Sequence, residues 1–127
     1  MPDRVRTAVD HLAASGHLAT WRVECTPTRR IVVCVFDETP PVAALRATTG
    51  VEGVRCRWTR SALRAARSMY QRVPDEFLSA FGENTRPDGQ PEITLEVKYV
   101  TEQLANAVEA LTGLVTVHGL IRRAEHS

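Results

Sequence analysis

The sequence predicts a single α+β domain in which helices pack on one mixed β-sheet. Three observations predict this class: a hairpin of two apolar strands near the N-terminus, helical periodicity between the strands, and a strand–helix–strand pattern near the C-terminus. The chain has 127 residues, of which 43% are hydrophobic and 24% charged, as in ordinary globular proteins. We therefore expect one two-layer domain over residues 1–127, with a mixed sheet of about five strands.

The N-terminal third predicts a helix followed by an antiparallel hairpin. Apolar residues recur at helical spacing over residues 3–14, and a glycine follows as a helix end. Residues 18–25 alternate between apolar and polar side chains, as a half-buried strand does. After a turn at residues 26–29, the continuous apolar run IVVCVF over residues 31–36 is typical of a strand that is covered on both faces.

This order of elements resembles the closing half of a winged-helix DNA-binding domain. The resemblance covers Val5 to Phe36, where a helix leads into a two-stranded hairpin with the basic residues Arg22, Arg29 and Arg30. It implies that the helix and the hairpin contact DNA. The sequence has no counterpart of the two helices that precede the recognition helix in such domains.

The middle of the chain predicts helices around one strand. Two prolines after a threonine start a helix over residues 42–49, which a glycine closes. Residues 54–58 alternate as a strand whose exposed face carries arginines, and residues 60–73 have the apolar spacing of a helix. A shorter helix is expected over residues 75–81, again ending at a glycine.

The C-terminal part predicts a parallel strand–helix–strand unit. Residues 83–91, ENTRPDGQP, form the strongest loop signal of the chain. A strand over 93–99, a helix over 101–112 and a strand over 114–121 follow, and this crossover length suits a parallel, right-handed connection. We expect residues 122–127 to be a frayed tail, and we expect no internal repeat.

Charge is distributed unevenly along the chain. Between residues 42 and 74 there are seven arginines and one acidic residue, whereas residues 75–110 hold eight acidic residues, one arginine and one lysine. The formal net charge of +1 conceals this segregation. The sequence therefore predicts a basic surface and an acidic surface on one protein.

Five arginines form the candidate binding site. Arg60, Arg64 and Arg67 fall on one side of the predicted helix, and Arg55 and Arg57 share one face of the preceding strand. Guanidinium groups in such a row suit phosphate oxygens, so the partner would be an anionic one, most simply nucleic acid. Two other interpretations stay open: the arginines form an ordinary solvated face, or they meet the acidic residues within the chain or across a homo-oligomer.

Enzyme and metal signatures are absent from the sequence. It contains no phosphate-binding loop, dinucleotide fingerprint, zinc-protease motif or nucleophile elbow, so no catalytic residue, metal ligand or cofactor is assigned. If a catalytic centre existed, His118 with Cys56 or Glu96 would be its first candidates. The three cysteines are interpreted as buried thiols, and the two tryptophans as core residues.

The sequence has no apolar run of transmembrane length and no signal-peptide pattern, so we expect a cytoplasmic protein without a membrane partner. The favoured function is a small non-enzymatic binding or regulatory module that engages an anionic partner through its arginine-rich surface. The first alternative is a protein-interaction or self-assembly module that uses complementary acidic and basic surfaces. The second alternative is a small enzyme or ligand-binding domain with a dispersed site.

Overall fold

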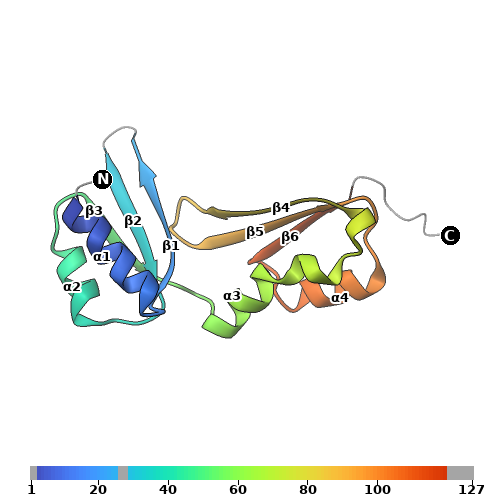
Figure 1. Cartoon of the computed structure of the whole chain (residues 1–127), viewed down its shortest axis with the longest axis horizontal. Helices are drawn as coiled ribbons and strands as arrows, with labels where there is room; N and C mark the ends of the chain where they lie inside the picture. Colours follow the sequence, from blue (N-terminus) through green and yellow to red (C-terminus); the bar gives the residue numbers. More distant parts are fainter. Residues whose placement is uncertain (1–2, 26–28, 120–127) are drawn as a thin grey trace. The chain divides into compact units, whose positions relative to one another are not determined.

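The computed structural model describes residues 3–25 and 29–119. Packing divides the chain into two compact units: a first unit of Met1–Arg60 with Thr85–Pro91, and a second unit of Ser61–Asn84 with Glu92–Ser127 (Figure 1). Each holds helices and a three-stranded mixed sheet, which confirms the α+β class. The expected single sheet of about five strands is wrong, because the strands form two sheets. One domain over residues 1–127 stays a prediction, and the expected tail at 122–127 lies outside the described residues.

The first unit is built around a central strand, β2. Its elements in chain order are α1 (Asp3–Ala14), β1 (Leu18–Glu24), β2 (Arg30–Val35), α2 (Pro40–Arg46) and β3 (Val51–Arg55). Strand β1 pairs with β2 in the antiparallel sense, and β3 pairs with the other edge of β2 in the parallel sense. The expected hairpin is therefore part of a three-stranded sheet rather than a separate two-stranded wing.

Both faces of β2 are covered. Ile31, Val33 and Val35 pack into a core with residues of α1 and α2 on one face. On the other face Val32 and Cys34 are also buried, each at 1% exposure or less. Gly89 lies against Val32, since a Cβ atom built on this glycine would be 2.9 Å from Val32 Cγ1. The apolar run predicted this two-sided burial, but not the segment that covers the second face.

Hydrogen bonds of the Gln90 side chain connect the segment Thr85–Pro91 to the end of β3. Its side chain donates from Nε2 to the backbone oxygen of Arg55 at 2.9 Å and accepts from the backbone nitrogen of Arg57 at 2.9 Å. Gln90 is the one buried polar residue among those described, at 5% exposure, and these two bonds satisfy its amide. The Gln90 amide thus forms the kind of hydrogen bonds with the backbone at the end of β3 that a neighbouring strand would form.

The second unit repeats the same kind of layer. Its elements are α3 (Arg60–Arg67), the 3₁₀ turns η1 (Met69–Arg72) and η2 (Asp75–Phe77), β4 (Leu78–Thr85), β5 (Pro91–Val97), α4 (Glu102–Glu109) and β6 (Val115–Gly119). Strand β5 is central, and it pairs with β6 in parallel as expected. The short connection from β4 to β5 makes that pair antiparallel. Figure 1 shows α3 and α4 on one side of this sheet.

Several expectations about local structure are wrong in whole or in part. Residues 75–81 were expected as a helix, but Leu78–Thr85 forms strand β4, because pairing with β5 outweighs weak local preferences. The loop expected over residues 83–91 is confirmed only at 86–90. Helix α3 ends at Arg67 instead of continuing to residue 73, and β3 begins directly after Gly50. Trp21 was expected in the core but is 41% exposed, because β1 is an edge strand.

The two units share one order of elements: helix, strand, strand, helix, strand. The central strand lies between an antiparallel and a parallel neighbour in each. Thr39 follows Ile31 at the same spacing as Thr101 follows Ile93, and each threonine is the N-cap of the crossover helix. No internal repeat was expected from the sequence, but the order and pairing of the elements are the same in the two units.

We predict that Gly89→Ala destabilises the first unit strongly. Gly89 has a φ of +86°, and its new Cβ atom would lie 2.6 Å from Val54 Cγ2. The left-handed backbone costs about 1–2 kcal/mol and overpacking about 1–3 kcal/mol, so the expected loss is about 2–5 kcal/mol. Chemical denaturation of both proteins measures it.

Gly16→Ala is the matched control. Gly16 has a φ of +79°, but nothing lies within 4 Å of the built Cβ atom. Only the backbone penalty of about 1–2 kcal/mol applies there. Equal losses at the two positions would show that Gly89 does not pack against β2 and β3.

Candidate functional site

The five arginines expected to bind an anion do not form one uniform row. Arg55 ends β3 and Arg57 follows it, and both belong to the first unit together with Arg60. Arg64 and Arg67 belong to the second unit, on the same helix α3 that Arg60 begins. All five are exposed. They differ in what their guanidinium groups contact.

Carboxylates of the same chain hold three of these arginines. Arg60 pairs with Asp37, and the Arg57 Nη2 atom lies 3.6 Å from the Oδ2 atom of Asp88. Arg67 binds Glu83 through two parallel hydrogen bonds of 2.8 Å and 2.9 Å, a geometry that fixes both side chains. An external anion would have to compete with a neighbouring carboxylate at each of these positions.

Arg55 and Arg64 differ from the other three. Both side chains are exposed, and within residues 3–25 and 29–119 no ion pair joins either of them. Arg55 lies on the strand whose end Gln90 holds, and Arg64 lies in the last turn of α3. Of the five expected residues, these two keep their full charge available to a partner.

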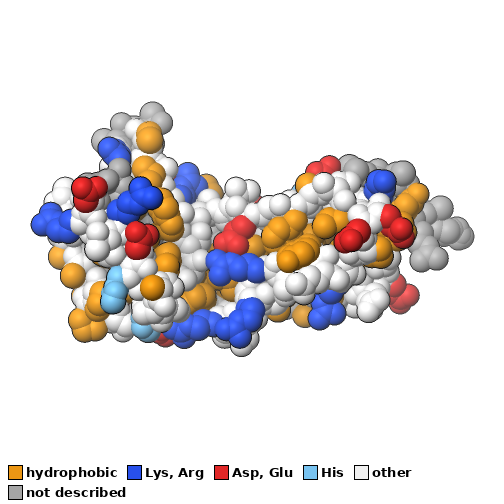
Figure 2. Space-filling model, in the orientation of Figure 1, with side chains coloured by type: hydrophobic (Ala, Val, Ile, Leu, Met, Phe, Trp, Pro, Cys, Tyr) orange, Lys and Arg blue, Asp and Glu red, His pale blue; other side chains and the backbone are white. Residues whose placement is uncertain are grey.

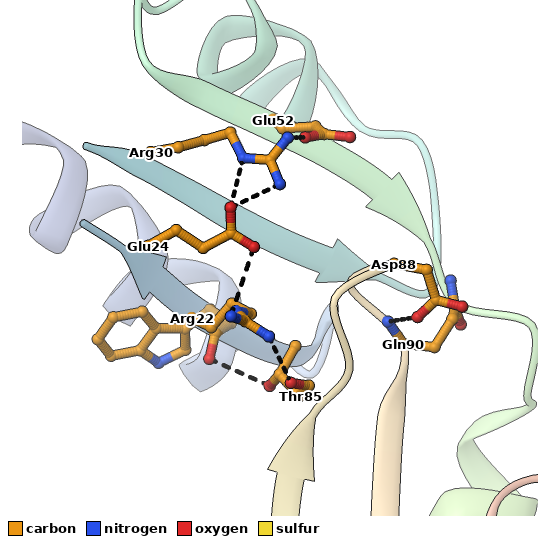
Figure 3. A network of polar contacts seen from close by, with 8 residues as sticks. Arg22, Glu24, Arg30, Glu52, Thr85, Asp88 and Gln90 are labelled. Carbon is orange, nitrogen blue, oxygen red and sulfur yellow. Dashed lines mark hydrogen bonds and ion pairs between the residues drawn. The ribbon is translucent and has the colours of Figure 1, made fainter. Parts of the chain in front are cut away.

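The other charges of the first sheet also neutralise one another. Figure 3 shows Arg22, Glu24, Arg30 and Glu52 in a chain of alternating sign that crosses β1, β2 and β3. Arg22 also donates to the backbone oxygen of Thr85 at 3.0 Å. On the face seen in Figure 2, acidic and basic side chains of the first unit accordingly lie next to one another. The hairpin arginines Arg22 and Arg30 are therefore structural.

A second cluster lies where the parallel strands β2 and β3 end. The Nδ1 atom of His17 lies 3.0 Å from the Oδ2 atom of Asp37, and Arg60 pairs with the same oxygen. Arg60 also donates from Nε to the backbone oxygen of Gly16 at 2.9 Å and lies 5.1 Å from the centre of the Phe36 ring. Hydrogen bonds from His17, the larger effect, and from Arg60 lower the pKa of Asp37.

This cluster has the arrangement of a positioned histidine. When His17 is neutral, Nδ1–H donates to Asp37, so that Nε2 carries the lone pair. Carboxyl ends of parallel strands are also where open α/β sheets bind ligands. Arg60, however, pairs with Asp37, donates a hydrogen bond to Gly16 and packs over the Phe36 ring. Its role in this cluster is therefore structural.

A concave feature of the first unit is an open groove of about 1060 Å³. Helices α1 and α2 form its walls, and the buried side chains of Val5, Ile31 and Leu45 form its apolar floor. The charged and titratable side chains among the described lining residues are Arg4, His11 and Arg29. No carboxylate is among the described residues that line the groove, whereas the arginines of the sheet have carboxylate neighbours.

Sequence reasoning missed this groove. Arg4 and His11 were separate positions on a helix, and Arg29 belonged to a turn, so no local spacing connected them. A signal did exist: the first helix is apolar on one side and carries Arg4, Thr7 and His11 on adjoining positions of another. Only the packing of α2 beside α1 turns this helix side into the wall of a groove.

Two of the three catalytic candidates are neighbours in one sheet, and the third belongs to the other unit. Glu96 and His118 are register partners on β5 and β6, a proximity that sequence alone did not give. Cys56 belongs to the first unit, beside the end of β3. His118 is exposed, because β6 is an edge strand.

Comparisons with known proteins give no family for this chain. No protein-family model matches the sequence, and no curated protein is significantly similar to it. Among the described residues, no three His, Cys, Asp or Glu side chains gather as metal ligands would. No helix in the described ranges is long and apolar enough to cross a membrane. The groove, the arginine surface and the histidine cluster are therefore the features on which a function can be proposed.

We predict that Asp37→Asn lowers the midpoint of thermal unfolding at neutral pH and has little effect in acid. The folded-state pKa of Asp37 is depressed, so its stabilisation is complete above the unfolded pKa of about 3.9 and disappears as pH falls below it. Thermal unfolding of both proteins between neutral and acidic pH measures the difference.

Asp10→Asn is the control for this series. Asp10 is an exposed carboxylate on α1 and makes no ion pair with a described residue. Its substitution is expected to leave the midpoint almost unchanged at every pH. A difference between wild type and Asp37→Asn that stays constant from neutral pH to a pH below the lowered folded-state pKa of Asp37 would contradict the role given to the Asp37 charge.

Proposed function

We propose that this chain is a binding module for an anionic partner, and that the groove between α1 and α2 is its main contact surface. The groove supports this proposal because it combines an apolar floor with a rim of Arg4, Arg29 and His11 and has no acidic lining residue. Binding sites generally join apolar area, which provides affinity, to a few polar groups, which provide orientation. This charge pattern is the observation that carries the proposal.

The chemistry of the groove favours an acidic, amphipathic protein segment over a nucleic acid. A phosphate backbone is polar throughout and is bound mainly by rows of cationic groups. An apolar floor such as that of Val5, Ile31 and Leu45 instead suits leucine-like side chains. Carboxylates on the same segment would pair with Arg4 and Arg29 at the rim.

The arginine surface expected from the sequence supports a second mode of binding. Arg55 and Arg64 retain exposed charges without a described carboxylate partner. In this mode the anionic partner is nucleic acid, and Arg57, Arg60 and Arg67 would exchange their present carboxylates for phosphates. We rank it second because each of these three arginines already has a carboxylate neighbour.

Self-assembly is a separate candidate function, favoured by the exposed aromatic side chains of the second unit. Tyr70 and Phe81 are 40% and 37% exposed, and their ring centres lie 5.1 Å apart. Tyr99, at 39% exposure, contacts Phe77. Aromatic side chains of this kind are enriched in protein interfaces. Light-scattering mass over a range of protein and salt concentrations tests this candidate, and a monomer under all conditions excludes it.

We predict that the double variant Arg4→Glu/Arg29→Glu weakens binding of an acidic, leucine-containing peptide. An exposed ion pair contributes up to about 1 kcal/mol, so replacing two attractive charges by repulsive ones lowers affinity by about tenfold or more. Fluorescence anisotropy of a labelled synthetic peptide, at low and high salt, measures the change. Binding to the wild type should weaken as salt rises.

The matched control is Arg6→Glu/Arg72→Glu, which changes the net charge equally at exposed positions outside the groove. A peptide that fails to bind at low salt, or that responds equally to both double variants, contradicts the groove proposal. Tight binding of a mixed-sequence oligonucleotide that Arg55→Glu/Arg64→Glu abolishes would assign the function to the arginine surface instead.

A further inference from the structure

The groove between α1 and α2 contains a histidine besides its two arginines. Arg4 and His11 are seven residues apart on α1, close to two helical turns, so both lie on the same side of the helix. Both side chains are exposed, and they line the groove together with Arg29. The rim thus combines two permanent cations with one side chain whose charge depends on pH.

The charged side chains that share the groove with His11 are both basic. They are Arg4 on the same helix and Arg29 in the segment before β2. Helix α2 and the residues after it line the groove only with apolar residues, threonines and a glycine. The acidic residues of α1, Asp3 and Asp10, are not among the described lining residues. Asp10 precedes His11 directly, and adjacent positions on a helix do not face each other.

The charged residues of the first sheet lie on its other face. The odd-numbered residues of β2 pack with α1 and α2, so alternation turns the even-numbered ones to the opposite face. Arg30 is one of these, and the strand register puts Arg22, Glu24 and Glu52 on the same face as Arg30. These four residues form ion pairs there. The sheet therefore separates their two carboxylates from His11. Asp37 and Glu38, which follow β2, pair with other cations and are not among the lining residues.

We propose that His11 contacts a carboxylate of the acidic partner directly and makes binding of this partner pH-dependent. The inference rests on the proposed function of the groove and adds a third, switchable cation to its rim. Histidine is the side chain that ordinarily changes its charge between about pH 5 and 8. The complex is therefore tighter in mildly acidic than in mildly alkaline solution.

The electrostatics of the groove give the direction of this effect. In the free protein, a positive His11 ring shares the groove with two arginines and with no described carboxylate. In the complex, the carboxylates of the partner offset this repulsion, and both ring nitrogens of the charged imidazole donate hydrogen bonds. His11 also lies in the last turn of α1, where exposed backbone carbonyls carry partial negative charge and accommodate a cation.

Binding of the partner and binding of a proton favour each other by the same factor, because coupling between two ligands is reciprocal. The proton comes from the solvent, and no covalent bond other than the N–H bond of the ring changes. Formation of the complex near neutral pH should therefore take up a fraction of one proton per partner. This uptake is a second observable, independent of affinity.

The test measures binding of a labelled synthetic peptide of leucines and glutamates to the full chain by fluorescence anisotropy at constant low salt. We expect the dissociation constant to fall about two- to fivefold between about pH 8 and pH 5.5, the size of one exposed ion pair. The glutamates of the peptide stay ionised over this range. Calorimetry near neutral pH, in two buffers of different ionisation enthalpy, measures the proton uptake.

Two variants locate the effect. His11→Gln keeps a polar side chain that is neutral at every pH, so it should bind the peptide equally well at both pH values and take up no proton. His118→Gln, at an exposed position of the second unit, should retain the pH dependence of the wild type. Because His11 is exposed, its replacement removes no buried contact, and circular dichroism verifies the fold of both variants.

The outcomes separate this inference from the proposed function of the groove. Wild-type binding that is unchanged between the two pH values overturns the inference alone and leaves the groove proposal in place. PH dependence that persists in His11→Gln, or that disappears in His118→Gln, also overturns it. A peptide that fails to bind at either pH contradicts the groove proposal, and the inference fails with it.

Discussion

The first unit depends on the burial of β2 on both faces. A strand with five consecutive apolar side chains, Ile31–Val35, exposes hydrophobic surface on two sides, so one helical layer is not enough to cover it. Helices α1 and α2 cover one side. The segment Thr85–Pro91, far away in the sequence, covers part of the other through Gly89 and is fixed by Gln90.

Charge pairing decides which cations are available for binding. The register of the first sheet places Arg30 between Glu24 and Glu52, so charges that are separate in sequence neutralise one another in space. Arg57, Arg60 and Arg67 likewise have carboxylate neighbours. Arg4 and Arg29 line a groove without acidic residues. Counting arginines along the chain therefore overstates the arginine surface and overlooks the groove.

The two units show how one arrangement of elements carries different chemistry. When Ile31 is aligned with Ile93, Asp37 of the first unit corresponds to Tyr99 of the second, and Cys34 corresponds to Glu96. In β2 every residue from Ile31 to Val35 is buried, whereas β5 alternates between buried and half-buried positions. The His17–Asp37 cluster thus belongs to the first unit. A shared fold carries no information about such sites.

Local patterns in the sequence determined the α+β class, the hairpin, the parallel strand–helix–strand unit and the apolar cores. These features follow from periodicity, helix caps and glycine positions, which act over a few residues. The division into two sheets, strand β4 and the cover on β2 were decided by tertiary structure, because they depend on pairing between distant segments. Tertiary structure also decided the groove and the His17–Asp37–Arg60 cluster. Each of these joins residues from different elements, and only the register and packing of those elements bring their side chains within reach of one another.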